Sequence, residues 1–198
     1  MNSILLFGII IWIYMLSVLK RAKLTAFSFI VGSVGFFFIL MAMSTPYWIW
    51  FFTHAVINGV AGLGKLGHMC QVYLKYGLVY ISNQYSPVTM QIDYECSGII
   101  ETMAYISLLA FYPTYSRKEK VFYLLMGMLW IYLSNVLRLM MVIVMVHFGG
   151  AGLFYLSHSI LGRIVFYLLV IILYYNVFTY SRLSRGLYKI FKERIRRA

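Results

Sequence analysis

Five apolar stretches, each holding at most one Asp, Glu, Lys or Arg, constrain this chain more than any other feature. They cover residues 4–19, 24–43, 98–112, 121–148 and 160–178. A helix of about 20 apolar residues crosses the roughly 30 Å hydrocarbon core of a bilayer. Because backbone polar groups must be satisfied internally there, the sequence predicts an all-α, polytopic integral membrane helix bundle with about five to seven spans.

The composition agrees with this class and excludes an ordinary soluble domain. Hydrophobic residues make up 63% of the chain and charged residues only 11%, whereas soluble domains carry about 25% charged residues. The net charge of +12 would favour a nucleic-acid partner in a soluble protein. In an apolar chain, cations instead mark the cytoplasmic ends of spans. We therefore expect one membrane domain over residues 1–198 and no nucleic-acid partner.

Three clusters of cations predict the orientation. They lie at residues 20–23, 117–120 and 182–197. If all three clusters are cytoplasmic, successive spans must cross the membrane in alternating directions between them. This is possible only when the segment between the second and third spans begins and ends outside the cell. We therefore expect a multi-pass plasma-membrane protein with a cytoplasmic C-terminus, whose basic tail lies against anionic lipid. The uncharged N-terminal stretch predicts a retained first span and not a cleaved signal peptide.

The predicted membrane domain divides into four parts: two N-terminal spans (1–53), an extracytoplasmic or re-entrant segment (54–95), a three-span core (96–181) and the basic tail (182–198). Residues 56–81 are only partly apolar and contain Lys65 and Lys75. We expect an interfacial amphipathic helix or a re-entrant helical pair there. Residues 86–94 alternate apolar and polar side chains, which predicts a short extended segment in an outside loop.

Arg138 is a cation inside an apolar span, which makes it a candidate functional residue. It lies ten residues before Phe148, and it is therefore about 15 Å deep if the span ends there. An arginine at such depth costs at least about 2.5 kcal/mol. Asn135 lies one turn earlier on the same helical face. The structural alternative is a buried ion pair that holds helices together.

Cys96 and His158 lie at the predicted outer ends of the two other core spans. A thiolate is a strong nucleophile, nearby cations stabilise it, and a histidine can accept the thiol proton. Asp93 and Glu95 act against the thiolate, so the hypothesis requires a cation, for which Arg138 is the candidate. A lone cysteine is more often an inert apolar residue, and an interfacial histidine is more often solvated.

Metal and cofactor sites are not expected. The spacing of Cys70 and Cys96 permits one disulfide but does not resemble a metal site. His54, His68 and His147 share no helical spacing and have no carboxylate companions.

Two further charges lie in the core spans. Glu101 is expected to pair with Arg138 or Arg163. Because Arg163 lies about 140° round a helix from His158, we expect it to meet a different partner, such as Glu101.

The candidate residues belong to three short motifs on successive spans. They read Cys96-Ser97-Gly98, Asn135-Val136-Leu137-Arg138 and His158-Ser159-Ile160-Leu161-Gly162, the last followed by Phe166. In this order they resemble the exosortase and archaeosortase family of polytopic membrane cysteine transpeptidases. The resemblance covers roughly residues 93–178. The chain is short for this family, and in its length it resembles the compact, XrtG-like type of Gram-positive bacteria.

The resemblance implies a sortase-like reaction at the outer membrane face. Cys96 would cleave secreted proteins near a C-terminal sorting signal, which consists of a short motif, an apolar helix and a basic cluster. The product would be a thioester that an acceptor resolves. Arg138 would hold the oxyanion and His158 would act as base and then acid, with Asn135, Gly98 and Gly162 as supporting positions.

Two other functions stay open from the residues. One is an intramembrane cysteine peptidase that only hydrolyses, since water and an amine compete for the same thioester. The other is a non-enzymatic transporter subunit in which Arg138, Arg163 and Glu101 line a polar path. The transporter reading predicts that Cys96 is dispensable.

Overall fold

The computed structural model describes residues 3–45, 47–67, 69–73, 77–83, 87–92 and 96–180. Within them the α-helices are α1 (Ser3–Arg21), α2 (Thr25–Met43), α3 (Tyr47–Gly67), α4 (Ile99–Phe111), α5 (Arg117–Gly149) and α6 (Gly162–Tyr174). The strands are β1 (Cys70–Tyr73), β2 (Leu78–Ile81) and β3 (Val88–Gln91). A short 3-10 turn, η3 (Ala151–Leu153), and two π-helices, η4 (Leu156–Leu161) and η5 (Tyr175–Tyr180), complete the described elements. Asp93, Glu95 and the basic tail lie outside the described residues.

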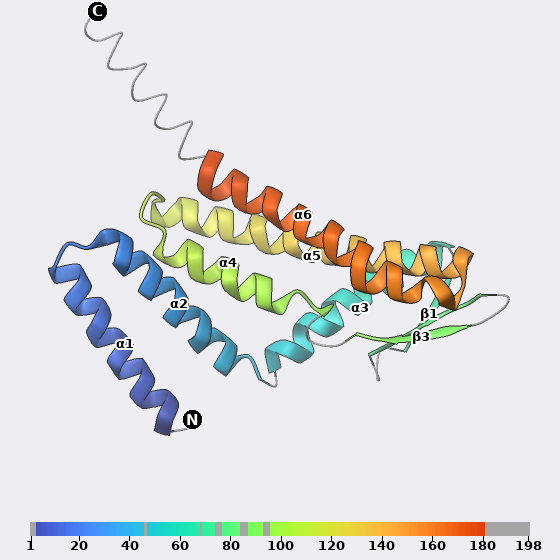
Figure 1. Ribbon diagram of the computed structural model, residues 1–198, viewed down its shortest axis with the longest axis horizontal. Coiled ribbons are helices and arrows are strands. Elements are labelled where there is room, and N and C mark those ends of the chain that lie inside the picture. The colour runs from blue at the N-terminus through green and yellow to red at the C-terminus, as the bar shows by residue number, and fades with distance from the viewer. Residues whose placement is uncertain are drawn as a thin grey trace, which may run out of the picture.

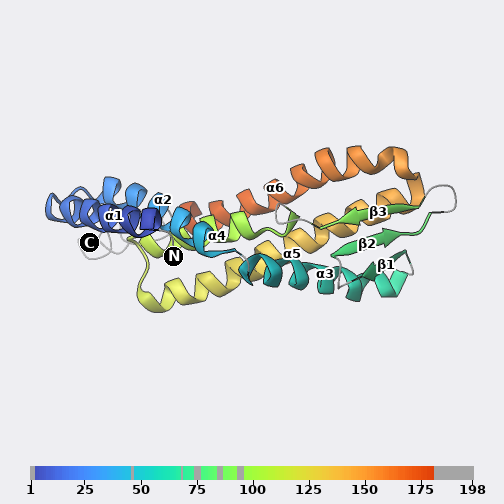
Figure 2. The same ribbon diagram turned by 90° about the horizontal axis from the view of Figure 1, so that it is seen from below.

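The molecule is elongated, with α1 and α2 at one end and the sheet at the other (Figures 1 and 2). Three helical stretches of the described chain are long and apolar enough to cross a membrane: Thr25–Met43, Arg117–Gly149 and Ala151–Tyr180. Helix α4 is apolar but shorter. The five apolar stretches seen in the sequence therefore correspond to α1, α2, α4, α5 and α6, and the mostly helical architecture agrees with a membrane helix bundle.

The expected all-α architecture is wrong over residues 70–91. Three strands there form an antiparallel sheet in the order β1-β2-β3, with Cys70 opposite Ile81 and Ile81 opposite Val88. Residues 56–81 therefore form neither a single amphipathic helix nor a re-entrant pair, because α3 ends at Gly67 and two strands follow it. The boundary expected at residue 53 falls inside α3. Extended structure within residues 86–94 is confirmed by β3.

Helix α5 organises the rest of the fold. Its 33 residues extend for about 50 Å, which is longer than the roughly 30 Å hydrocarbon core. Val142, Ile143 and Val146, near its C-terminus, pack with α3 and the sheet in one apolar cluster. The end of α5 is consequently not a measure of membrane depth. The depth of about 15 Å counted for Arg138 from Phe148 stays a prediction.

The start of α5 is fixed by local chemistry. Helix α4 ends before Pro113, and Ser116 then forms a capping box with Glu119. The Ser116 backbone N–H donates to Glu119 Oε2 at 2.8 Å, and the Glu119 N–H donates to Ser116 Oγ at 3.4 Å. Such a cap satisfies two backbone donors that a helix start leaves without partners.

A second apolar cluster joins α4, α5 and α6 on the other side of Arg138. Tyr105, Ile131, Phe166 and Val170 are among its buried members. A tyrosine hydroxyl also links the end of α4 to the end of the last helical stretch, since Tyr112 donates to the Phe178 carbonyl at 2.7 Å. Arg138 lies between the two clusters.

Candidate active site

The structure brings together the three residues that we expected to lie close to one another. Cys96 lies in the turn before α4, Arg138 on α5, and His158 in the π-helix η4. The Cys96 Sγ atom lies 3.7 Å from His158 Nε2. The Arg138 Nη2 group donates to the same sulfur at 3.7 Å. One thiol is therefore in contact with both an imidazole and a guanidinium.

The backbone around Cys96 is held by the other residues of its motif and by α5. Gly98 adopts a left-handed conformation with φ 72° at the start of α4, which glycine accepts without strain. Asn135 is fully buried, and its Nδ2 group donates to the Cys96 carbonyl at 2.6 Å. Thr102 Oγ1 donates to the Gly98 carbonyl at 2.8 Å. Asn135 and Gly98 thus position the thiol.

Arg138 is buried, with 4% of its surface exposed. Its guanidinium carbon lies 5.7 Å from the ring centroid of Phe166, a distance at which the aromatic face attracts a cation. Asn135 Oδ1 and Arg138 Nε are buried and have no hydrogen-bond partner among the residues that the structure describes. The site therefore has one buried acceptor and one buried donor that a bound molecule could satisfy.

His158 is positioned by an unusual helix turn. The π-helix η4 holds it between Ser157 and Ser159, and π-turns inside helices are rare and frequent at functional sites. Phe154 stacks on the imidazole with centroids 5.3 Å apart and an interplanar angle of 8°. Sequence reasoning did not identify Phe154, although its position four residues before His158 was a usable signal.

The expected pairing of Glu101 is only partly seen. Glu101 is half-buried in the first turn of α4 and interacts electrostatically with Arg138. Arg163 is exposed on α6. Among the described residues no ion pair joins Glu101 to Arg138 or to Arg163. The pairing of Arg163 with Glu101 was wrong because Arg163 faces the outside of the bundle.

Other reactive side chains lie apart from this site or are inert. Cys70 is a free thiol in β1, and burial raises its pKa above the ordinary value. His54 binds the Trp50 carbonyl at 2.8 Å, and His147 binds the Ser82 carbonyl. Within the described part of the chain no group of three His, Cys, Asp or Glu residues could hold a metal ion. The thiol of Cys96 is thus the reactive group to consider.

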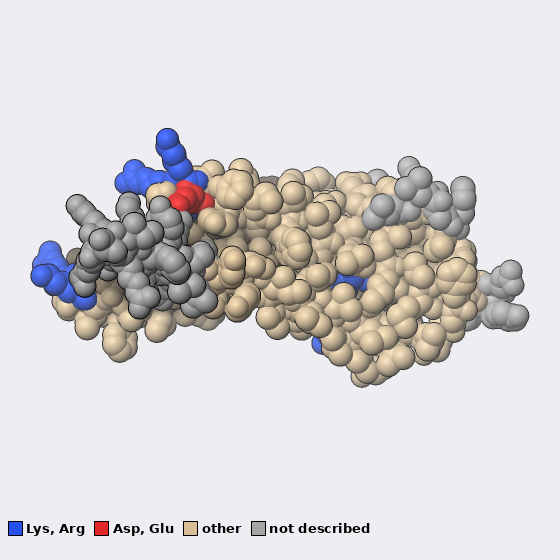
Figure 3. Space-filling model, turned by 90° about the horizontal axis from the view of Figure 1, so that it is seen from above, with Lys and Arg blue, Asp and Glu red and all other residues tan. Residues whose placement is uncertain are grey.

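Five exposed cations lie away from the site. Lys20, Arg21, Lys23, Arg117 and Lys118 are exposed near the ends of α1 and α5. Figure 3 shows Lys and Arg gathered toward one end of the molecule and a mostly uncharged surface elsewhere. The tan part of the face in Figure 3 is therefore suited to contact with lipid.

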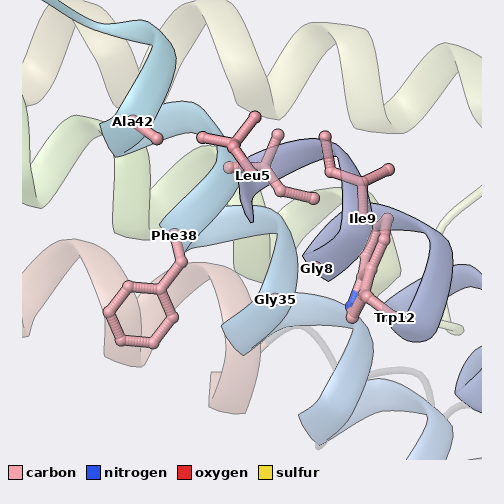
Figure 4. A pocket seen from close by; sticks show the side chains of 8 residues that line it. Leu5, Gly8, Ile9, Trp12, Gly35, Phe38 and Ala42 are labelled. Atoms are coloured by element: carbon pink, nitrogen blue, oxygen red, sulfur yellow. The ribbon is translucent and has the colours of Figure 1, made fainter. Parts of the chain in front are cut away.

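A hollow of about 330 Å³ between α1 and α2 carries no comparable chemistry. Figure 4 shows Leu5, Gly8 and Trp12 from α1 facing Gly35 and Phe38 from α2. The described lining offers no nucleophile, acid or base. We therefore do not consider it a reaction site.

Gly162 is expected to be a sensitive position in the site. An added Cβ would lie 2.9 Å from the Ser157 carbonyl oxygen and 3.3 Å from Arg138 Cγ. Gly162→Ala should therefore lower the free energy of unfolding by about 1–3 kcal/mol and slow alkylation of Cys96. Gly152→Ala is the matched control, because a Cβ there meets nothing within 4 Å. Thermal unfolding in detergent checks this; equal stability of the two variants would contradict it.

Comparison with known proteins adds no assignment. No protein-family model matches the chain, and neither the curated proteins nor the solved structures contain a match.

Proposed function

We propose that this protein is a membrane-embedded cysteine transpeptidase of the exosortase type. It acts on secreted proteins that carry a C-terminal sorting signal. The observation that carries the proposal is the position of Cys96 Sγ, 3.7 Å from both His158 Nε2 and Arg138 Nη2. A nucleophile in reach of a base and of a fixed cation is what acyl transfer requires. The three motifs that resemble the family supply these same residues.

The first half of the reaction forms a thioester. The Cys96 thiol gives its proton to His158 Nε2, and the thiolate attacks the carbonyl carbon of the scissile peptide bond. Arg138 stabilises the negative charge, first on sulfur and then on the carbonyl oxygen. His158 returns the proton to the departing amine nitrogen. The C–N bond breaks, and the apolar anchor leaves with a new amino terminus.

The second half resolves the thioester. An acceptor amine gives a proton to His158 and attacks the thioester carbonyl, which again places an oxyanion beside Arg138. The C–S bond breaks, and the Cys96 thiolate recovers a proton from His158. Water in place of the amine gives simple hydrolysis. The mass of the new C-terminus of the substrate distinguishes the two products.

The length of α5 supports a site at the outer boundary of the hydrocarbon core. The helix advances about 32 Å from Arg117 to Arg138, which matches a hydrocarbon thickness of about 30 Å. The loops that hold residues 20–23 and 112–117 lie at the end of the molecule away from the sheet (Figure 1). With these cations cytoplasmic, Cys96 and the sheet lie toward the outside.

Trapping of the thioester tests the proposal. The protein is purified from membranes of cells that overproduce a secreted protein with a short C-terminal motif, an apolar helix and a basic cluster. The intact mass should rise by the mass of the cleaved product less one water, with the modification on Cys96. Hydroxylamine should release it. An unmodified Cys96 beside an uncleaved substrate would contradict the proposal.

Thiol labelling tests the orientation. A membrane-impermeant maleimide added to intact cells should label Cys96, since we place the site at the outer face. Cys70 is the internal comparison. Because its raised pKa keeps it protonated at pH 7, its labelling should be slow at pH 7 and increase as the pH rises above its ordinary range. Labelling of Cys96 only after cell lysis would overturn the orientation.

A further inference from the structure

Strand β3 leaves one edge of the sheet open. It pairs with β2 on its other side, and the Ile92 N–H donates to the Gly77 carbonyl at 3.0 Å. Since hydrogen-bonded residues alternate along an antiparallel strand, Val88 and Met90 also direct their N–H and C=O groups to β2. Thr89 and Gln91 therefore direct theirs to the outer edge. No strand of the described chain pairs with that edge.

The open edge leads to the reactive thiol. Figure 2 shows β3 pointing from the end of the molecule toward its middle, and α4 continuing in the same direction. Cys96 stands between these two elements. In the same view β1 lies on the α3 side of the sheet and β3 on the α6 side, where His158 precedes α6. The edge and the site thus face one side of the molecule.

We propose that the outer edge of β3 binds the substrate as an additional parallel strand, which presents the scissile bond to Cys96. The inference rests on the proposed function and specifies how the peptide is recognised. The ligand is an extended peptide segment on the N-terminal side of the scissile bond. Its backbone hydrogen-bonds with the outward N–H and C=O groups of Thr89 and Gln91, as in other strand-addition complexes.

The path of the chain itself determines the direction of the added strand. Strand β3 points toward α4, Cys96 lies just before α4, and α4 is apolar. A substrate parallel to β3 would follow the same path, with an extended motif, a cleavage point beside Cys96 and an apolar anchor helix beyond it. An antiparallel strand would direct the anchor away from the apolar helices.

The backbone edge of β3 carries little of the protection seen on other exposed edges. Natural proteins protect such edges with short strands, lysine, proline or bulges. The four residues Val-Thr-Met-Gln contain no lysine or proline, and Pro87 directly precedes them. Thr89 and Gln91 are exposed, whereas Met90 is buried beneath them. A peptide can therefore reach the edge groups without displacing the core.

The experiment measures how fast Cys96 is labelled by peptides. The probes are a mixed-sequence pool of N-acetyl tetrapeptide chloromethyl ketones, the same pool with N-methylated backbones, and iodoacetamide. Gln91→Pro removes one outward N–H while keeping the ladder to β2, because proline is tolerated at an edge position of this kind. Gln91→Ala is the matched control, since it keeps the N–H.

We expect the ordinary pool to label wild-type Cys96 about ten-fold faster than the N-methylated pool, because backbone hydrogen bonds are lost on methylation. Gln91→Pro should slow labelling by the ordinary pool about five-fold. It should leave the iodoacetamide rate unchanged, which also shows that the site is intact. Gln91→Ala should behave like the wild type.

Equal rates for the two pools, or a Gln91→Pro variant as fast as the wild type, would overturn the inference. The inference would also be overturned if Gln91→Pro changed a dimer into a monomer and did not change the labelling rates. In that case the β3 edge of the wild-type protein pairs with a second copy of the chain. Labelling needs no turnover. The ordinary pool could therefore label the protein faster than the N-methylated pool even if no thioester with the secreted substrate ever forms. That result would refute the proposed function but would still support strand addition at β3.

Discussion

Cys96→Ala is expected to stop processing of the secreted substrate, with a loss of at least about 10⁴-fold in rate. The described residues around Arg138 and His158 offer no second thiol that could form the acyl-enzyme. The uncleaved precursor should accumulate in the membrane, where gel mobility and mass spectrometry detect it. Removing one buried sulfur should cost only about 1 kcal/mol of stability, so the protein should still be present at normal abundance.

Cys70→Ala is the matched control for this variant. Cys70 is a free thiol in β1, and its Sγ lies near Gly64 on α3. The substitution should leave processing within about two-fold of wild type, because Cys70 is not one of the three residues whose side chains meet at the Cys96 thiol. Normal processing in Cys96→Ala cells would exclude the cysteine mechanism and favour the transporter reading, in which Cys96 is dispensable.

Arg138→Met is expected to lower the rate by about 10²–10³-fold, the size of effect seen when a donor to an oxyanion is removed. Methionine keeps an unbranched apolar stem between the two clusters and next to Phe166, so folding should be retained. The charge and the contact with Cys96 Sγ are lost. Single-turnover formation of the thioester on Cys96, followed by intact mass, measures the effect directly.

Arg138→Lys separates charge from geometry. Lysine keeps the positive charge but not the planar guanidinium fork. We therefore expect a rate between those of wild type and Arg138→Met, with normal protein abundance. If Arg138→Met forms the thioester within about three-fold of the wild-type rate, Arg138 is a structural residue, and the proposed stabilisation of the oxyanion is wrong.

Hydropathy and motif order predicted the parts of the fold that depend on long or regular patterns. The five apolar stretches correspond to five helices, and Cys96, Arg138 and His158 meet because their helices are successive in the chain. The buried stripe of Ser134, Asn135 and Arg138 was readable from its spacing of three to four residues. These features persist over many turns, so local sequence is sufficient to show them.

Shorter and tertiary features were not predictable in this way. Strands β1 and β2 have four residues each, too few for a period-two pattern to be distinguished from a loop. They were missed for this reason, whereas β3 was expected as an extended segment but not as part of a sheet. Nothing in the sequence of α5 shows that α3 and the sheet cover its last turns. Arg163 was assigned a partner from helix geometry alone, and its actual environment depends on how α6 packs.

The π-helix at residues 156–161 should make this part of the chain sensitive to the deletion of a single residue. A π-turn holds one more residue than the α-turn it replaces, so deletion of a single residue there would produce a more regular helix. That change would leave the helical residues on either side in nearly the same rotation, because one full turn replaces another. It would shift the residues inside the turn, and His158 would lose its position beside Cys96. Natural selection should therefore accept substitutions at Ser159 or Ile160 far more readily than the loss of either residue.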